Sequence, residues 1–236
     1  MLPDVSRTTQ QEITTLETLW RARASQAWSA AKALDLAQTP LLGEGDDLYD
    51  WHWRAARWQH FVAMRATVES ELATARRFYE LAAHSAGEAV ALQPTRVEGQ
   101  FWRGTCLLEA ARHRGKLAAL GALAPTTAHL KSAIKLDESF HFAGPLRVKG
   151  RVMHLKPLLL GGNLDIAMAL YTRALQLFPA HTTTLLYLGE AQWADHQPAE
   201  AKTSWRAVLS APDDADWTWE GARDKKEAAR LLAKTS

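Results

Sequence analysis

The chain has 236 residues, of which 47% are hydrophobic and 23% charged, and a formal net charge of +2. This composition supplies enough apolar side chains for one packed domain or an extended helical array. The near balance of charge, without a run of like charges, argues against nucleic acid as a partner. No stretch of the sequence approaches the roughly 20 apolar residues of a membrane span.

The start of the sequence has neither an apolar signal core nor a lipid-attachment cysteine. We therefore expect a cytoplasmic protein as the sequence stands, and a periplasmic one if a signal sequence was removed. The single cysteine, Cys106, can form no intrachain disulfide, and its apolar neighbours predict a small buried side chain.

Residues 1–47 are predicted to form an N-terminal capping region. Within it, Ile13, Leu16 and Trp20 follow a helical period over residues 9–37. Such a helix would cover the apolar face of the first structural unit that follows it.

Two long helices are predicted in residues 49–94, and we place the turn between them near residues 68–70. The second helix carries Ala82, Ala86 and Ala89 at positions i, i+4 and i+7, which share one helix face. Small residues on one face allow a neighbouring helix to approach closely.

The same spacing returns in residues 162–179, where Ala167, Tyr171 and Ala174 share a helix face. Asn163 is predicted to cap this helix by accepting a hydrogen bond from a free backbone N–H, and a proline ends it.

Helix ends of the form Ala-x-x-Leu-x-Pro, or close relatives of it, recur along the chain at intervals that shorten toward the C-terminus. We infer a repeated helix pair, with insertions in the earlier units. Gly104 and Gly150 occupy the position where the two helices of a pair would approach closely. The helices predicted after residue 96 cover residues 97–112, 142–154, 162–179, 182–194, 199–209 and 217–234.

These features resemble the tetratricopeptide (TPR) repeat, a helix–turn–helix unit of about 34 residues. The resemblance implies an all-α fold, a right-handed TPR-like superhelix of about four repeats. The repeats would occupy residues 48–212 of a single domain covering 1–236. Residues 213–236 would form a C-terminal capping helix.

The second half resembles one branch in particular, the T component of the TPR-associated TRAP transporters. The resemblance rests on the segments VEGQFW (Val97–Trp102), LDESFHFAGPLRVKG (Leu136–Gly150) and KPLLLGGNLDIAMALYTRAL (Lys156–Leu175). It implies a periplasmic partner of a solute-binding protein in the uptake of small organic acids. Members of that branch are usually exported and lipid-anchored, and this sequence shows neither feature.

Arg147 and Arg151 lie four residues apart on one predicted helix. If they face the concave surface of the repeats, the two guanidinium groups could hold a carboxylate in bidentate fashion. The alternative is that both pair with carboxylates of a neighbouring helix or point into water. In the same register, the residues expected to line that surface include Phe101, Thr105, Glu190 and Trp193.

The segment 49–61 is the most aromatic part of the chain. Trp51 and Trp58 share one helix face, and Trp53 lies on another. Tryptophans at this spacing are commonly packing residues. With two aromatic faces, however, one face could pack while Trp53 and Arg54 on the other meet a partner or ligand.

Two apolar insertions, residues 115–127 and 156–162, are expected at the turns within helix pairs. In a stacked array such turns emerge on one edge, where the leucines of both insertions would form an exposed patch. A patch of this kind predicts a partner surface, a lid or a homo-oligomer contact.

No sequence motif indicates catalysis or a bound metal. Glu80 with His84, and Glu109 with His113, are isolated pairs at i, i+4, and there is no phosphate-binding loop or nucleophile elbow. We therefore expect no enzyme and no cofactor.

The leading hypothesis is a scaffold for protein–protein interaction, with an accessory role in organic-acid uptake and an acidic or hydrophobic ligand. The alternative is a cytoplasmic adaptor without a small-molecule ligand.

Overall fold

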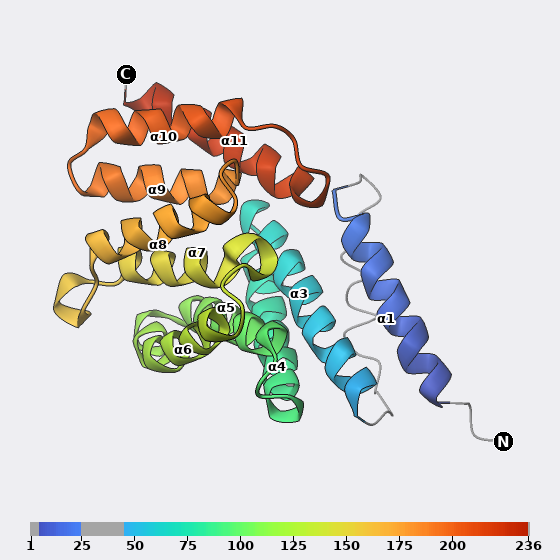
Figure 1. Cartoon of the computed structure of the whole chain (residues 1–236). Helices are drawn as coiled ribbons and strands as arrows, with labels where there is room; N and C mark the ends of the chain where they lie inside the picture. The colour runs from blue at the N-terminus through green and yellow to red at the C-terminus, as the bar shows by residue number, and fades with distance from the viewer. Residues whose placement is uncertain (1–4, 25–44, 236) are drawn as a thin grey trace. The chain divides into compact units, whose positions relative to one another are not determined.

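The computed structural model describes residues 5–24 and 45–235, and every regular element in these ranges is a helix (Figure 1). The all-α class expected from the helical periodicity is confirmed. The chain divides into two compact units, Met1–Leu136 and Asp137–Ser236. The predicted capping region 1–47 and the predicted helix over 9–37 lie partly outside the described residues.

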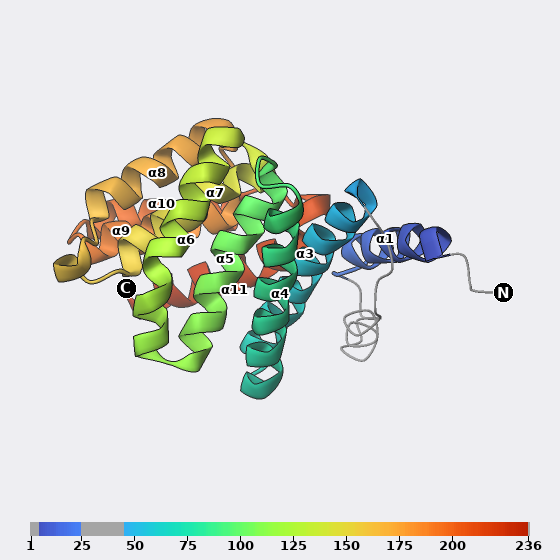
Figure 2. The same ribbon diagram turned by 90° about the horizontal axis from the view of Figure 1, so that it is seen from below.

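The first unit contains α1 (Val5–Arg21), α3 (Asp46–Val68), α4 (Leu72–Leu92), α5 (Val97–Arg114) and α6 (Lys116–Leu136). Helix α3 packs against α1 and α4, α4 packs against α5, and α5 packs against α6. Figures 1 and 2 show α3 to α6 side by side in chain order. The turn predicted near residues 68–70 is confirmed, and Ser70 adopts the left-handed backbone conformation there (φ 64°).

Helix α3 buries aromatic side chains on both of its predicted faces. Trp51, Trp53 and Trp58 are at most 8% exposed, and Tyr49 is fully buried. The Tyr49 hydroxyl donates to Glu98 Oε2 at 3.0 Å, which ties the start of α3 to the start of α5. Both aromatic faces of this helix therefore pack inside the protein.

The stretch 115–127, predicted as an insertion at a turn, is instead helical from Lys116 onward and continues through Pro125 in α6. Its leucines and alanines have high helix propensity, which outweighs the isolated Gly121. The break falls at the first residue of this stretch, Gly115, whose φ of 121° ends α5. Leu117 at the start of α6 is 85% exposed.

The second unit contains α7 (Phe140–Leu155), η1 (Leu158–Leu160), α8 (Leu164–Leu177), α9 (Thr182–Ala194), α10 (Pro198–Ser210), η2 (Ala215–Trp217) and α11 (Thr218–Lys234). Each helix from α7 to α10 packs against the next, and α11 packs against both α9 and α10. The predicted cap of α8 is confirmed, because the Asn163 side chain accepts the Ile166 N–H at 2.8 Å.

Three glycines mark places where a helix backbone touches a side chain of the following helix. A Cβ atom added at Gly104 would lie 2.9 Å from Leu130 Cγ, and one at Gly150 would lie 2.6 Å from Tyr171 Cε1. One added at Gly189 would lie 2.5 Å from Trp205 Nε1. The close approach predicted at the first two positions is confirmed. It recurs in the helix pairs α5–α6, α7–α8 and α9–α10.

Candidate functional site

The predicted site residues Trp53 and Arg54 lie where α3 meets α1. The Arg54 guanidinium carbon is 4.1 Å from the Trp53 ring centroid, and Arg54 Nε donates to Glu17 Oε1 at 2.7 Å. Arg57 donates to the same carboxylate at 2.8 Å. In this structure, both predicted site residues contribute to the packing of α1 on α3.

Phe101 and Thr105 lie one turn apart on α5 and are both buried. The Thr105 hydroxyl donates to the Phe101 carbonyl at 2.9 Å, so its hydrogen bond stays within the helix. The Phe101 ring packs edge-on against Trp102, with centroids 4.8 Å apart.

Arg147 is buried in the second unit and donates to backbone carbonyls. Its Nη1 lies 2.7 Å from the Phe142 carbonyl, and its Nη2 lies 3.4 Å from the His141 carbonyl. Burial lowers the pKa of Arg147 to about 10, because a charged guanidinium loses hydration inside the protein. The sequence predicts that this group binds a carboxylate of a ligand or of a neighbouring helix, or points into water. The structure instead gives it two carbonyls near the start of its own helix.

These carbonyls belong to an unusual left-handed turn at the start of α7. His141, Phe142 and Ala143 have φ values of 52°, 57° and 54°. Each L-residue in this conformation costs about 1–2 kcal/mol. The donated hydrogen bonds of Arg147, and one from Ala143 N–H to the Ser139 carbonyl at 3.0 Å, stabilise the turn.

Arg151 forms an ion pair with Glu190, which links α7 to α9. The Arg151 guanidinium carbon also lies 4.3 Å from the Tyr187 ring centroid. Trp193, one turn beyond Glu190, is 43% exposed, and its centroid is 5.8 Å from that of the buried Trp205. The structure therefore brings together the predicted residues Arg151 and Glu190, while Trp193 presents an aromatic surface on the same helix as Glu190.

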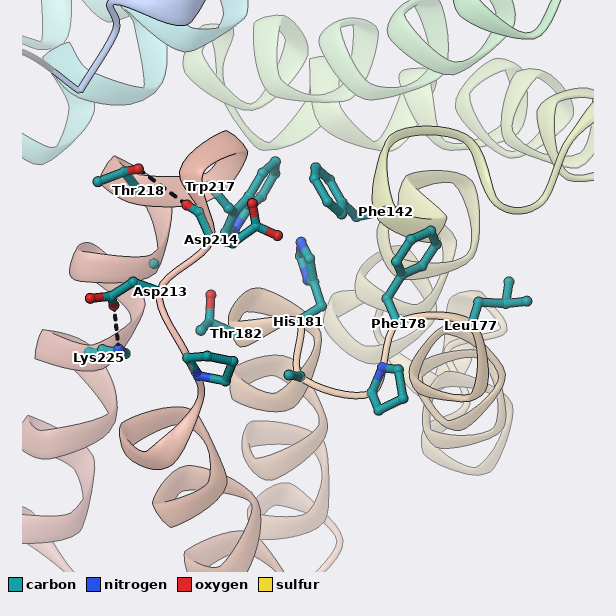
Figure 3. Close-up of a pocket in the computed structure, with 14 residues that line it drawn as sticks. Phe142, Leu177, Phe178, His181, Thr182, Asp213, Asp214, Trp217, Thr218 and Lys225 are labelled. Carbon is teal, nitrogen blue, oxygen red and sulfur yellow. Dashed lines mark hydrogen bonds and ion pairs between the residues drawn. The ribbon is translucent and has the colours of Figure 1, made fainter.

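A pocket of about 250 Å³ opens in the second unit between the start of α7, the α8–α9 turn and the segment before α11 (Figure 3). Its lining combines aromatic rings, prolines and charged groups: Phe142, Leu177, Phe178, Pro179, Ala180, His181, Thr182, Pro212, Asp213, Asp214, Trp217, Thr218, Gly221 and Lys225. The left-handed turn supplies Phe142, whose centroid is 5.6 Å from Phe178 and 5.3 Å from Trp217.

His181 is a buried polar side chain of this pocket. It caps α9, because its Nδ1 accepts the Thr184 N–H at 3.3 Å. With Nδ1 acting as acceptor, the proton of the neutral ring is assigned to Nε2. Burial, together with the charges of Arg147, His141 and Arg223, lowers the pKa of His181 far below its ordinary value, so the ring is uncharged.

Behind the pocket, Asp224 is fully buried and accepts hydrogen bonds from several donors. Thr182 Oγ1 donates to its Oδ2 at 2.9 Å, and Thr183 donates to the same oxygen. Arg223 Nη2 donates to the other oxygen at 2.6 Å. Trp217 Nε1 donates to Thr183 Oγ1 at 3.1 Å, which fixes one wall of the pocket to this network.

Two carboxylates and one ammonium group also line the pocket. Lys225 Nζ pairs with Asp213 Oδ1 at 2.7 Å, and Figure 3 shows this pair well to one side of His181. The Asp214 side chain lies closer to the aromatic rings, and its Oδ1 accepts the Asp216 N–H at 2.8 Å.

Three other kinds of feature bear on function in residues 5–24 and 45–235: metal-ligating clusters, thiols and membrane-spanning helices. No group of three or more His, Cys, Asp or Glu side chains in these ranges is arranged to hold a metal ion. Cys106 is buried as predicted, and burial raises the pKa of its thiol. None of the described helices combines the length and the apolar character needed to cross a bilayer.

The pocket was not predicted from the sequence. Its three walls come from separate segments, and no spacing rule joins Phe142, His181 and Trp217. The only local signal is the histidine that follows the helix-stopping Pro179 and precedes three threonines. Comparison of the chain with family models and with curated proteins finds no match.

Proposed function

We propose that the chain is a non-catalytic TPR-like scaffold that binds a protein partner. The observation that carries this proposal is the recurrence of one close helix contact at Gly104, Gly150 and Gly189. In each case the neighbour is a large buried side chain of the next helix. A repeated contact of this type favours stacked, equivalent helix pairs, and stacked pairs commonly present their surface to other proteins.

The partner surface proposed on the second unit is centred on Trp193. Tryptophan is enriched among residues that dominate binding energy at protein interfaces. Trp193 is more than one-third exposed, and its ring packs against the buried ring of Trp205. The neighbouring Arg151–Glu190 ion pair would form part of a polar rim.

The partner proposed from the sequence resemblance is a solute-binding protein of a TRAP-type organic-acid transporter. The alternative is a cytoplasmic adaptor that uses the same surface and has no small-molecule ligand. A neighbouring gene for a solute-binding protein or a TRAP membrane subunit would favour the first function. A native gene start without a signal sequence would favour the second.

The direct test is titration of the purified chain with a purified solute-binding protein of the TRAP type. We expect Trp193→Ala to weaken binding by at least about tenfold, the size of effect found at interface hot spots. Leu209→Ala is the matched control, because Leu209 on α10 is similarly exposed at 41%. Equal losses in both variants, or no binding by the wild type, would count against this surface and this partner.

A further inference from the structure

The pocket of the second unit contains a buried hydrogen-bond donor that has no acceptor in the described part of the chain. His181 is only 7% exposed, and its Nε2 atom has no hydrogen-bond partner among the described residues. Figure 3 shows the ring beside those of Trp217 and Phe142. A buried donor without an acceptor is costly, so a molecule that supplies an acceptor at Nε2 would be stabilised there.

An acceptor group lines the same pocket. Asp214 Oδ1 accepts the Asp216 N–H, and Oδ2 keeps lone pairs for a further donor. The second carboxylate, Asp213, is already paired with Lys225 away from the His181 ring. Near the histidine, the pocket therefore offers one neutral N–H donor and one carboxylate acceptor.

Aromatic rings enclose these polar groups. The His181 centroid is 4.7 Å from Trp217 and 5.5 Å from Phe142, and Phe178 lies beyond Phe142. Rings in this arrangement favour a planar, apolar ligand that can pack against their faces or edges. The left-handed turn that carries Phe142 is a strained element, and strain of this kind is concentrated at functional sites.

The charges around the pocket favour an uncharged ligand. Two carboxylates and one ammonium group line it, which gives a net negative lining and disfavors an anion. On the inner side, Arg147 and Arg223 already oppose a positive charge at His181, and a cationic ligand would meet the same field. The cavity of about 250 Å³ lies just below the usual range for drug-sized ligands, so a small molecule fits best.

We propose that this pocket binds a small, uncharged, planar ring with an amide edge, such as an aromatic lactam. Its carbonyl oxygen accepts the His181 Nε2–H, its adjacent N–H donates to Asp214, and its ring packs among Phe142, Phe178 and Trp217. This ligand class goes beyond the scaffold function proposed above. It differs from the organic acids that the sequence resemblance implies.

The probe is carbostyril, a bicyclic aromatic lactam, titrated into the full chain by isothermal titration calorimetry. Its O-methyl ether keeps the flat ring but lacks the N–H donor, and quinaldate is a carboxylate of the same ring system. We expect carbostyril to bind at least about tenfold more tightly than either analogue. Tighter binding of quinaldate, equal binding of the ether, or no binding of carbostyril would overturn the proposal.

Three variants connect binding to the named groups. His181→Asn keeps a side-chain acceptor suited to capping α9 but removes the ring N–H. Asp214→Asn keeps one oxygen for the Asp216 N–H and replaces the other with an amide nitrogen. We expect each to weaken carbostyril binding at least about tenfold, while Asp165→Asn on α8, an exposed aspartate outside the pocket lining, is the control and leaves it unchanged. Equal affinity in all three variants and the wild type would refute the assignment.

Circular dichroism of each variant separates loss of binding from loss of folding. If His181→Asn proves unfolded, Asp214→Asn still tests the amide edge, because Asp214 is exposed and does not cap α9. The Trp193→Ala variant is expected to bind carbostyril normally. Failure of the ligand proposal is thus distinguishable from failure of the partner surface.

Discussion

Replacing Gly150 with alanine tests whether close helix approach limits the packing of the second unit. In an exposed helix interior this change stabilises by roughly 0.5–1 kcal/mol. Here the new Cβ would lie 2.6 Å from Tyr171 Cε1 and 3.0 Å from Cδ1. Tyr171 is fully buried and packs with Ala167 and Ala191, so its ring has little room to move.

Overpacking of a well-filled core costs about 1–3 kcal/mol. After subtracting the propensity gain, we expect Gly150→Ala to lower the free energy of unfolding by about 1 kcal/mol, within a range of about 0–2.5 kcal/mol. The measurement is urea denaturation followed by circular dichroism. The control is Gly221→Ala on α11, where the added Cβ meets only Thr182 Oγ1 at 3.9 Å, an ordinary contact. This control should be stabilised by about 0.5–1 kcal/mol.

A double variant sharpens the test. In a Tyr171→Ala background the clash is removed, so adding Gly150→Ala should raise the free energy of unfolding relative to Tyr171→Ala alone. The sign of the glycine effect would thereby reverse between the two backgrounds, which is a direct measure of coupling between the two positions. If Gly150→Ala stabilises the wild-type background as much as Gly221→Ala does, the close-contact argument is wrong.

Arg147→Ala should lower the free energy of unfolding by about 3 kcal/mol, because two carbonyls lose a buried donor. Arg151→Ala should cost about 1–2 kcal/mol, because its ion pair with Glu190 is partly buried. A loss of about 1 kcal/mol or less for Arg147→Ala in urea denaturation would show that Arg147 does not hold the left-handed turn. Leu159 in the segment Leu158–Leu160 is 99% exposed. Deleting this segment should change the subunit count in native mass spectrometry and leave the helical circular dichroism signal intact. Loss of that signal would show that the leucines are needed for folding. Burial lowers the pKa of His154 to about 4 and that of His181 further. Since the unfolded chain then binds more protons below about pH 6.5, the free energy of unfolding should fall between pH 7 and pH 5; an unchanged or higher value at pH 5 would contradict the neutral burial of these rings.

The sequence by itself determined the all-α class and most helix boundaries. Periodic apolar and small residues, a capping asparagine and helix-stopping prolines act through neighbouring backbone atoms. The roles of Gly104 and Gly150 follow instead from the repeat spacing, which predicts where the two helices of a pair approach closely. The stretch 115–127 was misplaced because its leucines suggested a patch at a turn, although its helix propensity favoured an extension of α6.

Only the tertiary structure decided what the predicted site residues contact. Spacing placed Arg147 and Arg151 on one helix face, but the left-handed turn before Arg147 brings two carbonyls to its guanidinium, and Glu190 pairs with Arg151. The pocket likewise depends on contacts among Phe142, His181 and Trp217, which lie far apart in the sequence. Local periodicity fixes which residues share a helix face. The packing between helices fixes which faces are buried and which groups of atoms form a binding site.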